Sequence, residues 1–111
     1  MAYQRGEVLL VPVPFSDLSA TKVRPAIVVS SPLYHANEPD IILAAITSQI
    51  TTIGPLDCVL QDWQTAGLRF PSAFKPVLFT LEPSRVIFQV GSLSHSDLMN
   101  VEIRLRRMLA L

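Results

Sequence analysis

Short apolar runs, separated by polar segments, recur along the chain up to residue 93. They are rich in β-branched residues or leucine and are bounded by Pro, Ser, Asp or Thr, which is typical of strands. We predict strands over residues 8–11, 26–29, 41–46, 77–81 and 86–90, and a further short one over 57–60. The first three runs do not alternate between apolar and polar positions, which indicates burial on both faces. Such strands need outer cover, from a helix or from a second subunit.

Polar segments rich in turn-forming residues connect these runs. Glu82-Pro83-Ser84-Arg85 predicts a turn between the last two strands, and residues 62–67 predict one helical turn that Gly67 closes. Residues 16–23 and 31–40 are expected to be loops. The prolines fall at the edges of the apolar runs, which favours many short elements and argues against a helical bundle.

The pattern changes to a helical period near the C-terminus. Ser94 and Asp97 match a capping box, and Glu102 and Arg106 stand four residues apart as a supportive pair. The apolar positions that recur at helical spacing are Leu98, Val101, Leu105, Met108 and Leu109. We therefore predict an amphipathic helix packed on the sheet, whose arginines at 104, 106 and 107 form either a solvated face or an RNA-binding face.

Composition limits the class of protein. The chain has 111 residues, of which 50% are hydrophobic and 16% are charged, which predicts one folded domain over residues 1–111 rather than a disordered chain. The apolar excess suggests that a second copy covers part of the surface. The formal net charge of zero argues against a large duplex-binding footprint and leaves room for a narrow cleft with a few arginines.

The remaining candidate chemistry is sparse. Cys58 is the single cysteine and lies in an apolar run, so we expect a buried thiol and no intramolecular disulfide. His35 and His95 are expected at the surface, no residues have metal-ligand spacing, and we predict no cofactor. No apolar stretch is long enough to span a bilayer and no signal-peptide pattern is present, so we expect a cytoplasmic protein without membrane contact.

Four local patterns, in order along the chain, resemble the MazF/PemK toxin family. They are Arg5-Gly6-Glu7-Val8-Leu9-Leu10-Val11, Lys22-Val23-Arg24-Pro25-Ala26-Ile27-Val28-Val29-Ser30, Ile46-Thr47-Ser48-Gln49, and Ser84-Arg85-Val86 followed by Gly91-Ser92-Leu93-Ser94. The resemblance implies an SH3-like β-barrel that forms homodimers and belongs to a type II toxin–antitoxin system. It further implies metal-independent cleavage of single-stranded RNA to 2′,3′-cyclic phosphate and 5′-hydroxyl ends, blocked by a cognate antitoxin protein.

Arg24 and Thr47 are the catalytic candidates. Arg24 precedes Pro25, which holds its backbone extended, and a guanidinium matches the oxygens of a phosphate. Thr47 ends an apolar strand, where its hydroxyl can donate to the same phosphate. The alternatives are a surface ion pair for Arg24 and a backbone-satisfied hydroxyl for Thr47. The substrate-binding candidates are Lys22, Ser48, Gln49, Lys75 and Glu82. Phe15 and Phe70 are candidates for contact with a base or with the antitoxin.

One departure from the family pattern leaves a second function open. By alignment, Pro76 and Phe79 stand where many family members carry an acidic residue and an arginine. The loss of these charges favours the alternative of a non-catalytic binding module, since a toxin of the same fold poisons gyrase by protein contact. A DNA-binding regulator is a third and weaker hypothesis.

Overall fold

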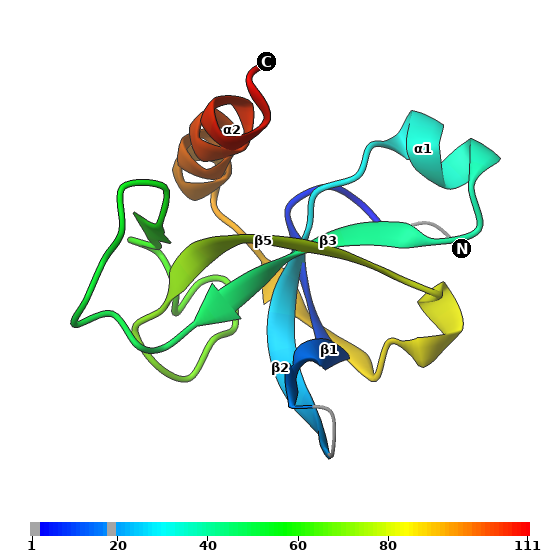
Figure 1. Ribbon diagram of the computed structural model, residues 1–111, viewed down its shortest axis with the longest axis horizontal. Helices are drawn as coiled ribbons and strands as arrows, with labels where there is room; N and C mark the ends of the chain where they lie inside the picture. Colours follow the sequence, from blue (N-terminus) through cyan, green and yellow to red (C-terminus); the bar gives the residue numbers. More distant parts are fainter. Residues whose placement is uncertain (1–2, 18–19) are drawn as a thin grey trace.

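Six antiparallel strands form one sheet in the computed structural model, which describes residues 3–17 and 20–111. Their order across the sheet is β4-β5-β3-β2-β1-β6. The strands are β1 (Glu7–Asp17), β2 (Ala20–Val28), β3 (Ile41–Thr47), β4 (Cys58–Val59), β5 (Ala73–Leu81) and β6 (Phe88–Ser92). Strands β3 and β5 run across the β1–β2 hairpin, so the sheet curves into a half-barrel (Figure 1). The predicted mainly β fold with a C-terminal helix is confirmed.

Two strands continue through prolines at which we expected them to end. Pro12 of β1 pairs with Val23, beyond the last β1–β6 pair, and Pro25 of β2 pairs with Leu10, before the first β2–β3 pair. Each proline therefore lies where its strand has a neighbour on one side only, and there the missing N–H costs no ladder hydrogen bond. The predicted loop is likewise wrong for residues 16–17 and 20–23, which belong to β1 and β2, because Asp17 already pairs with Ala20. Residues 18–19 lie outside the described residues.

The connections also differ from prediction in detail. The turn after β5 is a 3-10 helix, η1 (Pro83–Arg85), and β6 begins at Phe88 rather than at residue 86. The predicted loop over 31–40 contains a short helix, α1 (Pro32–Asn37). Ser31 caps it by accepting a hydrogen bond of 3.2 Å from the Tyr34 amide, and proline occupies the first turn. Ser followed by Pro is a helix-start signal that the sequence does carry.

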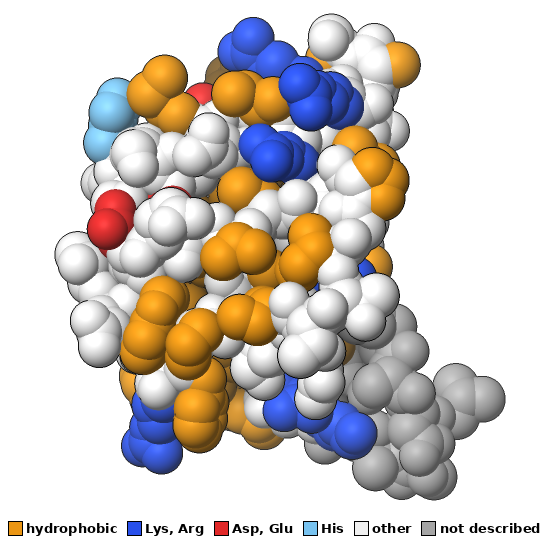
Figure 2. Space-filling view, turned by 90° about the vertical axis from the view of Figure 1, so that its left-hand side faces the viewer, with side chains coloured by type: hydrophobic (Ala, Val, Ile, Leu, Met, Phe, Trp, Pro, Cys, Tyr) orange, Lys and Arg blue, Asp and Glu red, His pale blue; other side chains and the backbone are white. Residues whose placement is uncertain are grey.

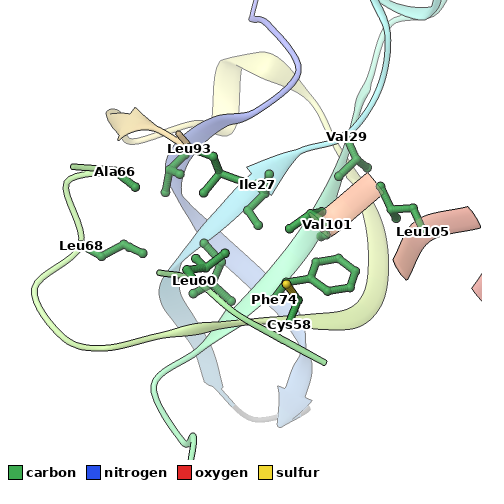
Figure 3. Packing of buried hydrophobic residues seen from close by; sticks show 13 residues of the cluster. Ile27, Val29, Cys58, Leu60, Ala66, Leu68, Phe74, Leu93, Val101 and Leu105 are labelled. Carbon is green, nitrogen blue, oxygen red and sulfur yellow. The ribbon is translucent and has the colours of Figure 1, made fainter. Parts of the chain in front are cut away.

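Apolar side chains cover both faces of the sheet, as the uninterrupted apolar runs predicted. On one face Ile27 and Phe74 pack against Val101 and Leu105 of α2 (His95–Leu109), with the Cys58 sulfur beside the Phe74 ring (Figure 3). On the other face Leu9, Val11, Val28 and Leu43 form a second cluster. None of the helices in the described part of the chain is long and apolar enough to cross a membrane.

The start of α2 is fixed to a distant loop. Ser94 caps the helix as predicted, accepting from the Asp97 amide at 3.2 Å. The Asp97 side chain is fully buried, and its carboxylate accepts hydrogen bonds from the amides of Gln61 (3.0 Å) and Asp62 (2.8 Å). The carboxylate therefore joins the helix to the segment after β4. Glu102 forms an ion pair with Arg5 at 3.0 Å and not the predicted pair with Arg106.

The turn over residues 62–67 lies directly on β6. Gly67 closes it with a φ of +87°, a conformation that favours glycine. A Cβ atom added at Gly67 would lie 2.4 Å from the Val90 carbonyl oxygen, and one added at Gly91 would lie 2.3 Å from the Ala66 carbonyl oxygen. The two glycines therefore allow the backbone of this turn to contact the backbone of the edge strand.

Candidate active site

A pocket of about 240 Å³ brings four of the predicted site residues together. Its polar lining consists of Lys22, Arg24, Thr47 and Lys75, and its apolar lining includes Val13, Ala45 and Val77. The predicted residues come from three different strands, β2, β3 and β5, which are separate in sequence and neighbours in the sheet.

Strand register explains why these side chains meet. Lys22 and Arg24 are two residues apart on β2, so they project from the same face of the sheet. Thr47 is the last residue of β3 and pairs with Ala73 on β5, and Lys75 follows two residues later. The pocket therefore lies where the end of β3 is flanked by the first half of β5 on one side and by β2 on the other.

The pocket concentrates positive charge in a chain whose formal net charge is zero. Lys22 and Arg24 are exposed, and neither forms an ion pair with any described side chain. The surface ion pair that we weighed against a functional role for Arg24 is therefore not found among the described side chains. In Figure 2, Lys and Arg side chains flank the lower end of a hydrophobic patch, and acidic side chains are few on this face. Such a site attracts anions.

The Thr47 hydroxyl is only partly occupied by the backbone. Its oxygen accepts a hydrogen bond from the Gln49 amide at 3.0 Å, which orients the side chain at the end of the strand. A threonine hydroxyl also carries one donor, and that hydrogen remains for a ligand. The backbone-satisfied alternative and the donor role are thus compatible in this geometry.

Asp57 contacts the site and was not predicted from the sequence. Its buried carboxylate lies 3.1 Å from the Lys75 ammonium and accepts a hydrogen bond of 2.9 Å from the Gly54 amide, both at Oδ2. The contact depends on the register between β4 and β5, in which Cys58 pairs with Phe74. Continuing that register by one residue places Asp57 opposite Lys75. No local sequence signal contains this information.

Three other predicted residues do not line the pocket. Ser48 and Gln49 follow Thr47 and are exposed beyond the end of β3. Glu82 lies after the far end of β5, because Leu81 pairs with Ile41 at the start of β3 whereas Ala73 pairs with Thr47 at its end. The structure therefore does not bring Glu82 to the pocket.

The two residues that depart from the family pattern lie in β5. Pro76 is half-buried beside Lys75, and Phe79 packs against the second apolar cluster. Of the two aromatic candidates for base contact, Phe70 is 64% exposed, and the Phe15 side chain lies outside the described residues.

Cys58 and His35 lie outside the lining of the pocket. Cys58 is buried as predicted, and its burial raises the pKa of the thiol, so it is a packing residue. His35 is half-buried rather than at the surface, because its Nε2 atom lies 2.5 Å from the Ser30 hydroxyl. Among the described residues, no three His, Cys, Asp or Glu side chains come together as a metal site requires.

A guanidinium, two ammonium groups and a hydroxyl donor line one pocket, which is a set of groups suited to binding an anion. The guanidinium can offer two parallel N–H groups to the oxygens of a phosphate, and the ammonium groups add charge with less directional preference. A donor and fixed cations around one phosphate are also what a phosphoryl transition state needs, since negative charge builds up on its oxygens.

Comparison with known proteins gives a family and a fold. A sequence profile for PemK-like, MazF-like toxins of type II toxin–antitoxin systems matches residues 4–109. No curated protein matches the chain in sequence. Among solved structures, an endoribonuclease in complex with its cognate antitoxin from a mycobacterial species has a TM-score of 0.79 at 16% identity, covering 99% of this chain and 97% of the other. MazF from Deinococcus radiodurans has a TM-score of 0.77 at 18% identity, with coverage of 100% and 99%.

Proposed function

Because the chain belongs to the PemK-like, MazF-like toxins of type II toxin–antitoxin systems, we propose that it is an endoribonuclease that cuts single-stranded RNA. The observation that carries the proposal is the pocket, where Arg24, Thr47 and Lys75 from three strands surround one space. Solved structures with this fold include proteins described as endoribonucleases, which supports the same activity here.

In the proposed reaction the ribose 2′-oxygen bonds to the adjacent phosphorus, and the bond from phosphorus to the 5′-oxygen breaks. The 2′-hydroxyl loses a proton and the 5′-oxygen gains one, so the products are a 2′,3′-cyclic phosphate and a 5′-hydroxyl. Arg24 stabilises the charge on the phosphate oxygens through two parallel N–H groups, and the Thr47 hydroxyl donates to the same group. Lys22 contacts a neighbouring phosphate of the strand.

The decisive experiment incubates the purified protein, free of any antitoxin, with a long unstructured RNA in the presence of EDTA. We expect discrete fragments whose ends are 2′,3′-cyclic phosphate and 5′-hydroxyl, because no step of the proposed reaction needs a metal. The readout is mapping of both fragment ends. Intact RNA from a protein shown by circular dichroism to be folded would contradict the proposal.

A non-catalytic binding module is the second candidate function. The observation that favours it is the absence of any carboxylate among the described side chains that line the pocket, together with Pro76 and Phe79 in β5. A ribonuclease needs a group that accepts the 2′-hydroxyl proton, and a carboxylate is a common one. This alternative expects partner binding and no RNA product at any protein concentration, so the EDTA experiment separates the two.

We also propose that a second copy of the chain covers an apolar strip across β6, β1 and β2. Leu10 pairs with Phe88, and Pro12 with Val23, so these four side chains share one face of the sheet. Phe88 is 56% exposed and Val23 is 48% exposed. Neighbouring exposed apolar side chains of this kind mark an interaction surface.

The substitution Phe88→Glu is expected to convert a dimer to a monomer, because it places an unpaired charge at the most exposed apolar side chain of the strip. Light scattering coupled to size-exclusion chromatography at micromolar concentration measures the mass. Met99→Glu is the matched control, since Met99 is also half-exposed but lies on α2. A parent chain that is monomeric at that concentration would exclude the dimer.

The proposed partner protein is an antitoxin. The solved structures with this fold include a mycobacterial endoribonuclease in complex with its cognate antitoxin and a crystal structure of MazE-MazF from Deinococcus radiodurans. The pocket suits an acidic segment, whose carboxylates would occupy the positions proposed for phosphate oxygens. The complex should therefore be inactive toward RNA, and growth arrest should follow expression of this chain alone.

A further inference from the structure

We infer that Asp57 is a positioning residue, which holds the Lys75 ammonium at the pocket so that it meets the RNA phosphate in one fixed place. This inference rests on the proposed function. It assigns a role to a carboxylate that does not line the pocket. Asp57 also does not stand at either position, 76 or 79, where many family members carry a charged residue.

The geometry of the pair is that of a fixed anion and an accessible cation. The Asp57 side chain is 4% exposed and the Lys75 side chain is 39% exposed, at an Nζ–Oδ2 distance of 3.1 Å. The two residues face each other across antiparallel strands by the register of Cys58 with Phe74. Opposite charges that face each other across antiparallel strands attract, and here the buried Asp57 carboxylate has little freedom to move.

The backbone holds Asp57 in place independently of Lys75. The Gly54 amide donates to the same Oδ2 atom at 2.9 Å and closes a short turn, in which the Asp57 amide donates back to the Gly54 carbonyl. A free lysine side chain populates many rotamers, and ordering it on substrate binding has an entropic cost. The pair with Asp57 orders Lys75 before RNA arrives.

Lys75 keeps binding capacity after forming this pair. An ammonium group has three N–H donors, and one of them is directed to Asp57, so two remain for phosphate oxygens. Lys75 itself lines the pocket beside Thr47, whereas Asp57 does not. The carboxylate therefore orders the cation without occupying the space proposed for the phosphate.

The test is a double-mutant cycle on cleavage of a defined RNA. We expect Asp57→Asn to lower kcat by about tenfold or more, as a misplaced contact does, with a smaller change in KM. Since Asp57 acts through Lys75, adding Asp57→Asn to Lys75→Met should change kcat by less than about twofold. Glu102→Gln is the matched control, because it removes one carboxylate from the other described ion pair, Arg5–Glu102, and should leave kcat unchanged.

Two results would overturn the inference while leaving the proposed function intact. One is cleavage by Asp57→Asn at the parental kcat. The other is an equal loss of kcat when Asp57→Asn is introduced into the parent and into Lys75→Met, which is what a merely structural role predicts. If Asp57→Asn does not fold, Asp57→Ser replaces it, since a hydroxyl can still accept from Gly54.

Absence of cleavage by the parent would contradict the proposed function, and the inference is then tested by binding. The probe is a single-stranded 2′-O-methyl RNA, whose blocked 2′-oxygen prevents cleavage. Asp57→Asn should change the affinity of the protein for this RNA in the parental background and not in the Lys75→Met background. An equal change in both backgrounds, or none in either, would overturn the positioning role.

Discussion

Arg24→Ala is expected to lower the rate of RNA cleavage by about 10²–10³-fold, the usual loss when one preorganised donor to a transition-state charge is removed. Arg24 is exposed on β2 without an ion pair to a described side chain, so its loss should leave the fold unchanged. Single-turnover cleavage assays measure the rate, and thermal unfolding of the same samples checks the fold. The growth arrest caused by the parent should disappear with the activity.

Arg106→Ala is the comparison that gives this result its meaning. Arg106 is an exposed arginine on α2, in the cluster that could be either a solvated face or an RNA-binding face. We expect the Arg106→Ala variant to cleave RNA at nearly the parental rate. Cleavage by Arg24→Ala at the parental rate would place the active site elsewhere, and loss of activity in Arg106→Ala would direct attention to the helix.

Gly91→Ala is expected to destabilise the protein by about 3 kcal/mol or more, at the upper end of what overpacking a closed interior costs. The added Cβ would lie 2.3 Å from the Ala66 carbonyl oxygen and 2.8 Å from its carbonyl carbon. These are backbone atoms, so no side-chain rotation relieves the contact, and the turn over residues 62–67 must move away from β6. Chemical denaturation measures the free energy of unfolding.

Gly54→Ala provides the matched control for this substitution. The nearest atoms to a Cβ at Gly54 belong to Asp57 and lie 3.7–3.9 Å away, an ordinary contact distance. We expect a change within about 1 kcal/mol, because a compatible Gly to Ala change mainly restricts the unfolded chain. Equal stability of Gly91→Ala and the parent would mean that the turn does not contact β6 as closely as described.

Much of the fold could be predicted because the informative signals are local. The apolar runs located β3, the buried parts of β1 and β2, and only the second half of β5, and the Ser94 cap together with the helical period located α2. The errors occurred where tertiary context overrides a local rule. Pro12 and Pro25 continue their strands because each lies where only one neighbouring strand pairs, and that depends on the sheet order.

The candidate site likewise contains residues that local sequence signals could nominate and one residue that they could not. Arg24 and Thr47 lie in short motifs, so sequence alone could nominate them, and the structure places both in one pocket. Asp57 could not be nominated, because its contact with Lys75 exists only through the pairing of β4 with β5. Glu82 was nominated because it lies near Pro76 and Phe79 in sequence, where many family members carry charged residues. An extended strand separates Glu82 from Lys75 and the pocket, since each strand residue adds about 3.3 Å.

The buried Asp97 carboxylate has a consequence for how the protein opens. It joins the N-terminal end of α2 to Gln61 and Asp62, and the same segment ends at Gly67, where it lies against β6. Helix, segment and edge strand therefore cannot separate one at a time without exposing a buried carboxylate or a backbone contact. They should exchange their amide hydrogens together, as one cooperative unit, and the β2 residues Lys22 and Arg24 in the pocket lining should exchange independently of it.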